Sequence, residues 1–432
     1  MIKQKKVGLS LSGGGYRAAA FHLGTLRKLD ELGILSSVDV ISTISGGSIT
    51  GACYSLSKEP FASFDQQMAA TLSGKSVIRY VLLSRRSLLG WLLVLLLLAS
   101  LLYLPFTADA WISVFVLAMV VLLIAFFQYK LFPVSVIIER AYNTFFYKEA
   151  TLSQLCEQPL LVIGSTNIQT CRQFSFSRVK MDDSSYSYRI PAIKFKHAAF
   201  PVARAVMASS CVPFAFAPVG IDRAFFADPA DADMVNPQLV DGGVYDNQGI
   251  HRLTQKGSYQ CDIIIASDAG NKLPFSKSYN NVFVLLIRTM DVFMQRIKNF
   301  QMMQHLYFNT RTVNKEIAYL SLGWDLENCI KGFIDNLGAG NITDLVIAAH
   351  EIPGEWVQDV KGHREELQQL LEQRVGYAAI AQRALTEDEL VVARKVGTNL
   401  TKLSVQKVLL LSKHAANLTE LQVKLYCPSL LQ

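Results

Sequence analysis

Residue 45 of this chain is a serine at a position where a strand would turn sharply into a helix. It stands in the segment ISTISGGS, residues 41–48, after a β-branched apolar run. Small neighbours permit the strained backbone angles that push a serine hydroxyl out of a sheet, as in a nucleophile elbow. Ser42 and Ser48 lack this spacing, so Ser45 is the candidate nucleophile, although a Ser-Gly-Gly turn can also be purely structural. The small residues that follow it are Gly46 and Gly47.

An aspartate followed by two glycines provides a second reactive group, in the segment DGGVYDNQG at residues 241–249. This pattern commonly forms a simple turn. However, Gly242 and Gly243 also let a carboxylate reach a neighbouring loop without steric obstruction. Asp241 is therefore the candidate general base for Ser45. Asp246 is the alternative, in a position that also suits a supporting role or a helix N-cap.

Three consecutive glycines, Gly13, Gly14 and Gly15, lie in the segment SGGGYRA at residues 12–18. Between a strand and a helix they let several backbone N–H groups point into one concavity, where the positive end of the helix dipole also attracts an anion. The loop could hold a phosphate or the oxyanion of a tetrahedral intermediate. It is not a Walker A loop, because no Gly-Lys-Ser/Thr follows. Arg17 could steady the loop or contact an anionic group of a ligand.

A histidine could complete a triad with these groups. The seven candidates are His22, His197, His251, His305, His350, His363 and His414. His22 is expected on the helix after the glycine loop, and His251 follows the aspartate segment closely enough to be a third member. None has a spacing that requires catalysis, so a Ser45–Asp241 dyad is favoured over a triad. No zinc pattern is present, and we expect neither a metal site nor a cofactor.

Short apolar runs that end in glycine turns would position these groups. Val7–Leu11 leads into the glycine loop and Val38–Ile44 leads into Ser45, and between them a helical pattern of leucines ends near Gly33. Successive strand–turn–helix units indicate a parallel α/β sheet that binds its ligand at the carboxyl ends of the strands. Further strands are predicted at Leu160–Gly164, Cys261–Ser267 and Val282–Ile287.

Two long uncharged stretches interrupt this pattern, from Ser87 to Ala108 and from Ala110 to Tyr129. A membrane-spanning helix needs about 20 mostly apolar residues, so we predict spans at about 88–106 and 111–129. The short segment 104–109 between them makes the two helices an antiparallel hairpin. The alternative is a buried helical hairpin in a soluble core or an interfacial re-entrant segment.

Basic residues flank both outer ends of this hairpin and predict its orientation. They are Lys75, Arg79, Arg85, Arg86, Lys130 and Arg140. Because positive charge accumulates on the cytoplasmic side of a membrane, both flanking parts are expected in the cytoplasm. The overall net charge of +7 includes no dense Lys/Arg run, so it favours anionic membrane surfaces over nucleic acid.

The last third of the chain gives a diffuse signal. The segment 313–385 is predicted to be mixed helix and loop. The sequence TEDE at residues 386–389 is a capping box before a periodic apolar run, which predicts a helix near the C-terminus.

In this order and at this spacing, the three motifs resemble those of the patatin-like phospholipases, which pair G-G-G-x-R-G with G-x-S-x-G and D-G-G/A. The segment ASSCVPFAFAP, residues 208–218, also stands where the family carries a similar one. The resemblance covers residues 7–55 and about 160–290. Ala18 and Thr43 each replace a glycine of the family motifs, and both are small enough to remove neither a hydrogen-bond donor nor the nucleophile.

The resemblance implies an α/β fold of three α/β/α layers with a mainly parallel central sheet and an inserted transmembrane helical hairpin. Residues 1–75 would carry the oxyanion loop and the nucleophile elbow, and residues 146–300 the remainder of the catalytic domain with Asp241. Residues 76–145 would form the membrane insertion. Residues 301–432 would form a mainly helical extension packed on the catalytic domain.

The activity that the resemblance implies is a membrane-anchored serine carboxylic ester hydrolase of the phospholipase A or lysophospholipase type. Ser45 would form a covalent acyl-enzyme with Asp241 as base, and the Gly13–Gly15 loop would hold the oxyanion. Membrane phospholipids or lysophospholipids would be the substrates, and the hairpin would bind the bilayer. The alternatives are an acylglycerol lipase or acyltransferase with the same dyad, a non-catalytic membrane scaffold, and a phosphate-binding domain.

Overall fold

The structure is a computed structural model that describes residues 5–103, 106, 110–271 and 279–431. A mixed β-sheet forms its centre, with the strand order β5-β4-β3-β2-β1-β8-β9, while β7 pairs with β3 and β6 pairs with β7. The strands are β1 Val7–Leu11, β2 Val40–Ile44, β3 Leu160–Asn167, β4 Arg172–Ser177, β5 Met181–Asp183, β6 Val219–Gly220, β7 Gln238–Asp241, β8 Ile263–Asp268 and β9 Glu316–Ser321.

The strands that hold the candidate site are parallel to one another. Neighbours in the series β3-β2-β1-β8-β9 all pair in parallel, whereas β4, β5, β6 and β7 are added by antiparallel pairing. The prediction of a mainly parallel sheet is therefore confirmed. Because β1, β2 and β8 run in the same direction, the turns that follow them lie at one edge of the sheet.

Alternating side chains of these strands point into two separate apolar cores. Leu9 and Ile265 contribute to the larger core on one face, and Ile264 and Ile317 contribute to the smaller core on the other. The period of two along each strand places successive residues on opposite faces. Both faces are covered, so the strands read as continuous apolar runs in the sequence.

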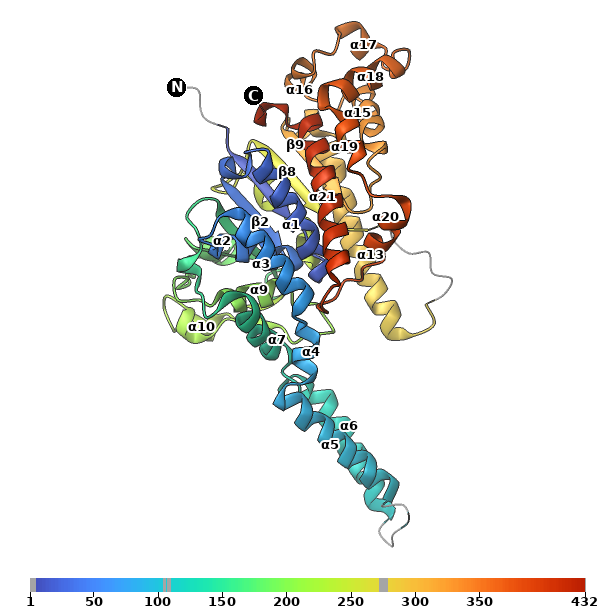
Figure 1. Cartoon of the computed structure of the whole chain (residues 1–432). Coiled ribbons are helices and arrows are strands. Elements are labelled where there is room, and N and C mark those ends of the chain that lie inside the picture. Colours follow the sequence, from blue (N-terminus) through green and yellow to red (C-terminus); the bar gives the residue numbers. More distant parts are fainter. Residues whose placement is uncertain (1–4, 104–105, 107–109, 272–278, 432) are drawn as a thin grey trace.

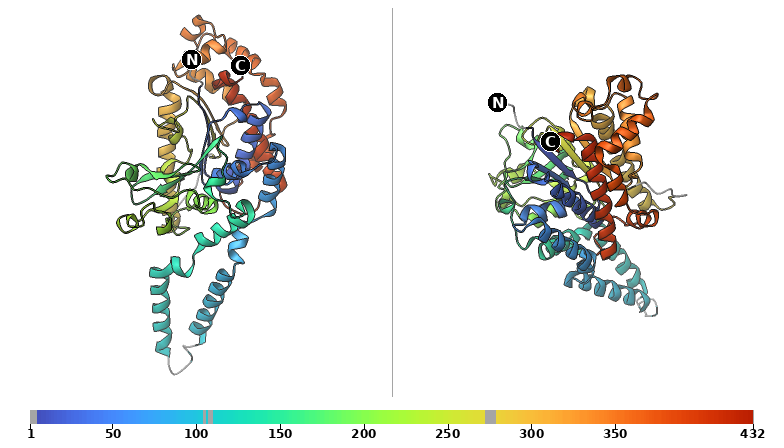
Figure 2. Two further views of the ribbon diagram at one scale, coloured as in Figure 1. Left: turned by 90° about the vertical axis from the view of Figure 1, so that its left-hand side faces the viewer. Right: turned by 45° about the horizontal axis from the view of Figure 1, so that its top comes forward.

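Helices cover both faces of the sheet. In Figure 2 (left), helix α13 lies on one side of the strands, and helices α1 and α21 lie on the other. Helix α21 is buried along most of its length and packs along α1 (Figure 1). The helices of the first half are α1 Gly15–Glu31, α2 Gly46–Leu56, α3 Phe61–Gly74, α4 Val77–Leu82, α5 Arg85–Tyr103, α6 Ala110–Leu131, α7 Val134–Tyr142, α8 Ser184–Ser187 and α9 Val202–Ser209. Those of the second half are α10 Asp231–Met234, α11 Gly243–Asp246, α12 His251–Thr254, α13 Val282–Met302, α14 Asn309–Thr312, α15 Asn328–Gly338, α16 Asp344–Ala349, α17 Gly354–Gln358, α18 Arg364–Val375, α19 Tyr377–Gln382, α20 Glu387–Arg394 and α21 Val405–Tyr426.

Two of the secondary-structure predictions are wrong. The run Val282–Ile287 is not a strand but the first part of helix α13, because a short apolar run has no period that separates a buried strand from a helix. The segment 313–385 contains strand β9, which pairs with β8 and so gives this part of the chain a place in the sheet. The capping box at Thr386 is confirmed: its hydroxyl accepts from the Glu389 N–H, and the Glu389 carboxylate accepts from the Thr386 N–H.

Helices α5 and α6 form a hairpin that projects from the body of the molecule (Figure 1). Helix α5 is long and apolar enough to cross a bilayer, with a mean hydropathy of 2.0, and none of that stretch is buried. The stretches Trp111–Leu123 and Phe126–Tyr147 are long and apolar enough to cross a bilayer only when they are taken together. The two are bent by 73° relative to each other. Of the predicted turn at residues 104–109, all but Phe106 lie outside the described residues.

Candidate active site

The candidate residues from three distant parts of the sequence line one cavity of about 580 Å³. Gly13, Gly14 and Gly15 reach it from the end of β1, and Ser45 from the end of β2. Asp241 reaches it from the end of β7. Strand β3 pairs with both β7 and β2, and this brings the ends of β7 and β2 close together. Arg17 also lines the cavity. Gly46 and Gly47 begin helix α2, and Gly242 leads from β7 into α11, which begins at Gly243; none of these four glycines is among the lining residues.

Ser45 has a strained backbone at the junction of β2 and α2. Its φ of 48° and ψ of −116° lie outside the regions that L residues normally adopt. Such strain persists only where the surroundings hold it, and it is concentrated at functional sites. The Ser45 N–H donates to the Ser209 hydroxyl at 2.8 Å. Gly46 is required next to it, because a β-carbon there would lie 2.2 Å from the Gly15 carbonyl oxygen.

The glycine loop offers fewer free donors than its sequence indicates. The Gly13 N–H donates to the Asn247 carbonyl at 3.0 Å, so this donor is already engaged. Gly14 and Gly15 begin helix α1, and among the described residues no acceptor binds their N–H groups. Their φ values of 141° and 60° turn this backbone into conformations that favour glycine. Gly14 and Gly15 can therefore bind an anion in the cavity, and Gly13 positions the loop.

The Asp241 carboxylate is almost fully buried and accepts a hydrogen bond from the Gly243 N–H at 2.7 Å. Burial raises the pKa of Asp241 to about 6, although the Gly243 N–H and the nearby Ser45 hydroxyl act to lower it. A carboxylate with a raised pKa is a better proton acceptor and is still ionised near neutral pH. The Asp241 N–H donates to the Cys211 carbonyl at 2.8 Å, which fixes the end of β7.

The alternative base, Asp246, does not line the cavity. Its buried carboxylate accepts from the N–H groups of Gln248, Gly249 and His251, so it organises the loop that follows Asp241. His251 contacts the Tyr245 hydroxyl instead, at 3.3 Å. None of the seven histidines, all of them among the described residues, lines the cavity. The structure therefore offers the Ser45 hydroxyl a carboxylate and no imidazole.

His22 supports the glycine loop from behind. Its Nε2 lies 2.9 Å from the Ser12 carbonyl oxygen and its Nδ1 lies 2.9 Å from the Ser267 hydroxyl. Burial lowers its pKa to about 4, so the ring is neutral at pH 7. Because a carbonyl only accepts, Nε2 carries the proton and Nδ1 accepts from Ser267. The ring fixes the backbone immediately before Gly13.

The cavity has one polar end. Asp268, at the end of β8, accepts from Lys298 at 2.5 Å and from the Tyr319 hydroxyl at 2.7 Å. Burial acts to raise the pKa of Asp268, but Lys298 and these hydrogen bonds hold it below its usual value. The buried guanidinium of Arg17 lies close enough to interact with the Asp268 charge, and burial lowers the pKa of Arg17. The other walls include the apolar side chains of Ile78, Val212, Phe216, Met290, Met294 and Leu400.

Sequence reasoning missed the residues that hold the reactive groups in place. Ser209 accepts from the Ser45 N–H and donates to the Gly164 carbonyl at 2.6 Å, so one hydroxyl links β2, β3 and α9. Its only signal was its place in the ASSCVPFAFAP segment. Asn247 had the signal of its place in the DGGVYDNQG segment, but its contact with Gly13 did not follow from it. Asp268 carried no signal, because its role depends on contacts with Lys298 and Tyr319. Among the described residues, no three His, Cys, Asp or Glu side chains gather as a metal site would require.

Comparison with known proteins identifies a family for this chain. A family model described as patatin-like phospholipase matches residues 9–254, more than half of the chain. Curated proteins gave no match.

Solved structures match as well, among them the following two. VipD from Legionella pneumophila is 13% identical, with 96% of this chain and 91% of that chain covered and a TM-score of 0.32. Human GIVD cytosolic phospholipase A2 in complex with methyl gamma-linolenyl fluorophosphonate is 14% identical, with 99% of this chain and 59% of that chain covered and a TM-score of 0.46. The present chain thus spans about three fifths of the human enzyme's chain.

Proposed function

The chain belongs to the patatin-like phospholipase family, and on this basis we propose that it is a membrane-anchored lipid acyl hydrolase with a Ser45–Asp241 dyad. Its substrates would be the carboxylic esters of membrane phospholipids or lysophospholipids. The observation that carries the proposal is that Ser45 and the buried Asp241 carboxylate line the same cavity, with the Ser45 hydroxyl near enough to lower the pKa of Asp241. Both groups face a cavity that also exposes the N–H groups of Gly14 and Gly15.

Acylation follows from these positions. As Ser45 Oγ attacks the ester carbonyl carbon, its proton passes to Asp241. The negative charge that develops on the carbonyl oxygen is bound by the Gly14 and Gly15 N–H groups, each worth about 3 kcal/mol in the transition state. When the tetrahedral intermediate collapses, the carbon–oxygen bond to the alcohol breaks and Asp241 returns the proton to the leaving oxygen. The fatty acyl group is left on Ser45.

Deacylation repeats the same steps with water. Asp241 accepts a proton from a water molecule as its oxygen attacks the acyl carbonyl carbon. The acyl–Ser45 bond then breaks, Ser45 recovers the proton, and the free fatty acid leaves. Burial helps both half-reactions, because a carboxylate removed from water is more basic than one that is solvated.

The shape of the cavity suits a lipid ester. Its volume of about 580 Å³ and its apolar walls are of the kind that bury an alkyl chain. The polar end with Arg17 and Lys298 would face the glycerol or headgroup side of the substrate.

We also infer that the α5–α6 hairpin anchors the enzyme in a bilayer, with the catalytic domain on the cytoplasmic side. The exposed side chains of both helices are almost entirely apolar, including Leu89, Trp91, Trp111 and Phe115. A patch of this size is unfavourable in water and typical of a membrane contact. The basic residues at the base of the hairpin favour the cytoplasmic side.

Release of fatty acid from mixed micelles of phosphatidylcholine and detergent tests the catalytic proposal. Full-length wild type should release fatty acid, and Ser45→Ala should lower the rate at least about 10⁴-fold, because the attacking group is gone. Ser36→Ala removes an exposed hydroxyl far from the cavity and should leave the rate unchanged. Equal activity of Ser45→Ala and Ser36→Ala would refute the proposed nucleophile.

A further inference from the structure

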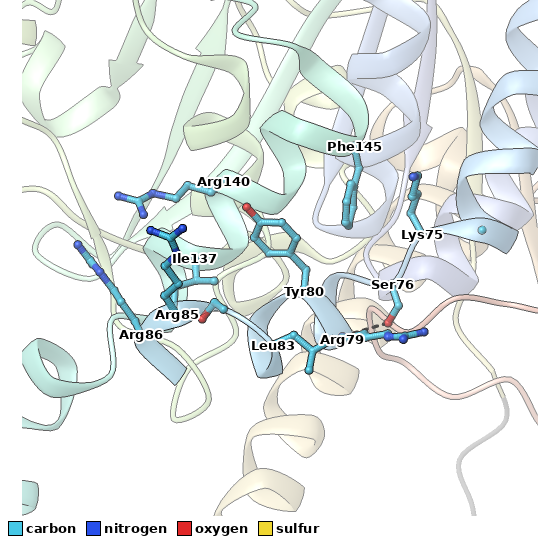
Figure 3. A pocket seen from close by; sticks show the side chains of 12 residues that line it. Lys75, Ser76, Arg79, Tyr80, Leu83, Arg85, Arg86, Ile137, Arg140 and Phe145 are labelled. Atoms are coloured by element: carbon cyan, nitrogen blue, oxygen red, sulfur yellow. Dashed lines mark hydrogen bonds between the residues drawn. The ribbon is translucent and has the colours of Figure 1, made fainter. Parts of the chain in front are cut away.

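A second cavity, of about 610 Å³, lies at the base of the hairpin (Figure 3). We call it the basal pocket. The segment from the end of α3 to the start of α5 forms one part of it, and α7 with the turn after it forms the other. It is separate from the candidate active site, with which it shares no lining residue.

The basal pocket is lined by five cationic side chains and by no carboxylate. The cations are Lys75, Arg79, Arg85, Arg86 and Arg140. In Figure 3, Arg85, Arg86 and Arg140 lie on one side of Tyr80, and Lys75 lies on the other. No ion pair joins any of the five to a carboxylate of the described residues. Glu139, the neighbour of Arg140, interacts more strongly with Arg204.

Five like charges around one cavity repel each other, and no ion pair with a described residue neutralises them. A bound anion would relieve this repulsion. Guanidinium groups suit phosphate in particular, because two parallel N–H groups can bind two phosphate oxygens at once. The Ser76 and Ser84 hydroxyls at the rim add polar groups. The chemistry of the pocket therefore points to a phosphate ester.

The position of the basal pocket indicates where that phosphate would come from. Arg85 is the first residue of helix α5, and the uncharged stretch of the hairpin begins two residues later. If the hairpin crosses a bilayer, as proposed above, the pocket lies at the depth of the lipid headgroups. The rings of Tyr80 and Phe145 meet edge to face at 5.5 Å within it, and aromatic side chains favour this interface.

Helix α4 separates the basal pocket from the catalytic cavity. Arg79 and Tyr80 line the pocket, while Ile78 of the same helix lines the cavity. The N–H groups of Val77 and Ile78 donate to the Leu400 carbonyl, and Leu400 also lines the cavity. A headgroup in the basal pocket would therefore contact the helix that forms one lip of the catalytic cavity.

We propose that the basal pocket binds the phosphate headgroup of an anionic phospholipid that is not the substrate undergoing hydrolysis. The proposal rests on the membrane anchoring inferred above, but not on the Ser45–Asp241 chemistry. The bound lipid would hold the catalytic cavity at the membrane surface. A soluble phosphate compound has related chemistry, and the experiment separates this occupant from a lipid.

The test measures lipid binding by full-length Ser45→Ala protein in a neutral maltoside detergent, so that no ligand is hydrolysed. Dioctanoyl phosphatidylglycerol is titrated against dioctanoyl phosphatidylcholine, with glycerol 3-phosphate as the free-phosphate arm. Phosphatidylglycerol should bind at least about ten-fold more tightly than phosphatidylcholine and at least about ten-fold more tightly than glycerol 3-phosphate. Equal binding of the two lipids would overturn the proposal, and equal binding of glycerol 3-phosphate would assign the pocket to a soluble phosphate compound instead.

Matched variants locate the binding. Arg79→Gln, Arg85→Gln and Arg140→Gln combined should weaken phosphatidylglycerol binding about 100-fold, about five-fold for each cation removed. The control combines Lys256→Gln, Lys331→Gln and Lys361→Gln, which remove three exposed charges elsewhere, and should stay within about two-fold of the parent. Similar losses in both proteins would refute the assignment.

Two further measurements keep the test decisive. If the triple Gln variant does not fold, a variant with Arg79→Lys, Arg85→Lys and Arg140→Lys is used instead. This variant keeps the three charges, so its affinity for phosphatidylglycerol should stay within about ten-fold of the parent. A loss of more than 100-fold with Lys in a folded protein would exclude a charge-based site. Hydrolysis is measured separately on a soluble ester with Ser45 present, so failure of the dyad proposal would leave the binding result unaffected.

Discussion

In the candidate active site, each reactive group is held by a partner from helix α9 or the loop after it, whereas helix α5 of the hairpin has no buried residue. The Ser45 N–H is bound by Ser209, and the Asp241 N–H by the Cys211 carbonyl. The hairpin instead presents large apolar side chains outward along its length. The cavity is thus formed by long-range contacts, and the hairpin by local helix propensity and composition.

This difference determines how each region should respond to change. Where a hydroxyl and a carboxylate depend on several buried hydrogen bonds, a substitution of a single atom or methyl group should have a large effect. Where a segment makes few contacts with the rest of the molecule, removing all of it should leave the remainder intact. The predictions below test this difference from the largest effect to the smallest.

The largest effect is expected from Asp241→Asn, which replaces one carboxylate oxygen by an amide. Loss of the base should lower kcat for a soluble ester about 10³-fold. The substitution should not destabilise the protein. Because the folded pKa of Asp241, about 6, is higher than its ordinary value of 3.8, ionisation of this carboxyl lowers the stability of the fold as the pH rises above about 4, and the loss is complete above pH 6. The asparagine side chain does not ionise and avoids this loss. At pH 8 the apparent melting temperature should be equal or higher. A destabilised variant with normal kcat would contradict a catalytic role.

A smaller loss is expected from moving one oxyanion donor. In Gly15→Ala the new β-carbon would lie 2.5 Å from the Asn399 carbonyl oxygen, and φ is 60°. The loop must shift, so kcat should fall about 10²-fold. Gly33→Ala is the matched control: its φ is 71°, but nothing lies within 4 Å of the added atom. It should lower the unfolding free energy by about 1 kcal/mol with unchanged kcat. Equal kcat in both variants would show that the loop is not an oxyanion site.

The value of kcat/KM for a neutral soluble ester should fall ten-fold for each pH unit below about pH 6. Asp241 accepts a proton only when it is ionised, and its pKa is about 6 because it is buried. His22 and His251, whose pKa values burial lowers to about 4, do not titrate in this window. The measurement is kcat/KM for a neutral soluble ester between pH 4.5 and 8.5, at concentrations below KM. A flat profile between pH 5 and 7 would contradict Asp241 as the base.

The smallest effect on kcat is expected from removal of the hairpin, although this is the largest change in the sequence. Replacing residues 88–129 by a short Gly/Ser linker should release the protein from membranes and leave kcat for a soluble ester within about three-fold. Membrane fractionation and the soluble-ester assay, carried out on the same preparations, test both parts. A protein that still sediments with membranes, or one that fails to fold, would show that the hairpin is not a separate anchor.

The sequence predicted those parts of the site that short motifs encode. Ser45, Asp241 and the glycine loop each lie in a turn whose residue types reveal the backbone conformation. The strands before Ser45 and the glycine loop were predicted, whereas strand β7 before Asp241 was not. The structure brings these three turns to one cavity. Their catalytic roles remain predictions.

The remainder of the site could not be read from the sequence because it depends on contacts between distant residues. Whether Gly13 donates into the cavity depends on Asn247, which lies 234 residues away and accepts its N–H. The Asp268–Lys298–Tyr319 cluster needs β9 beside β8, and β9 fell in a segment predicted to be helix and loop. Residues 282–287 could not be assigned for a different reason. Their short apolar run is compatible with a strand as well as with the helix that they form.

Covalent labelling measures the contact between hydroxyl and carboxylate most directly. Full-length wild type is treated with a fluorophosphonate, and the modified residue is located by peptide mass spectrometry. The adduct should form on Ser45, and the labelling rate should fall about 100-fold in Asp241→Asn at the same melting temperature. An adduct on another residue, or an undiminished rate in Asp241→Asn, would contradict the dyad.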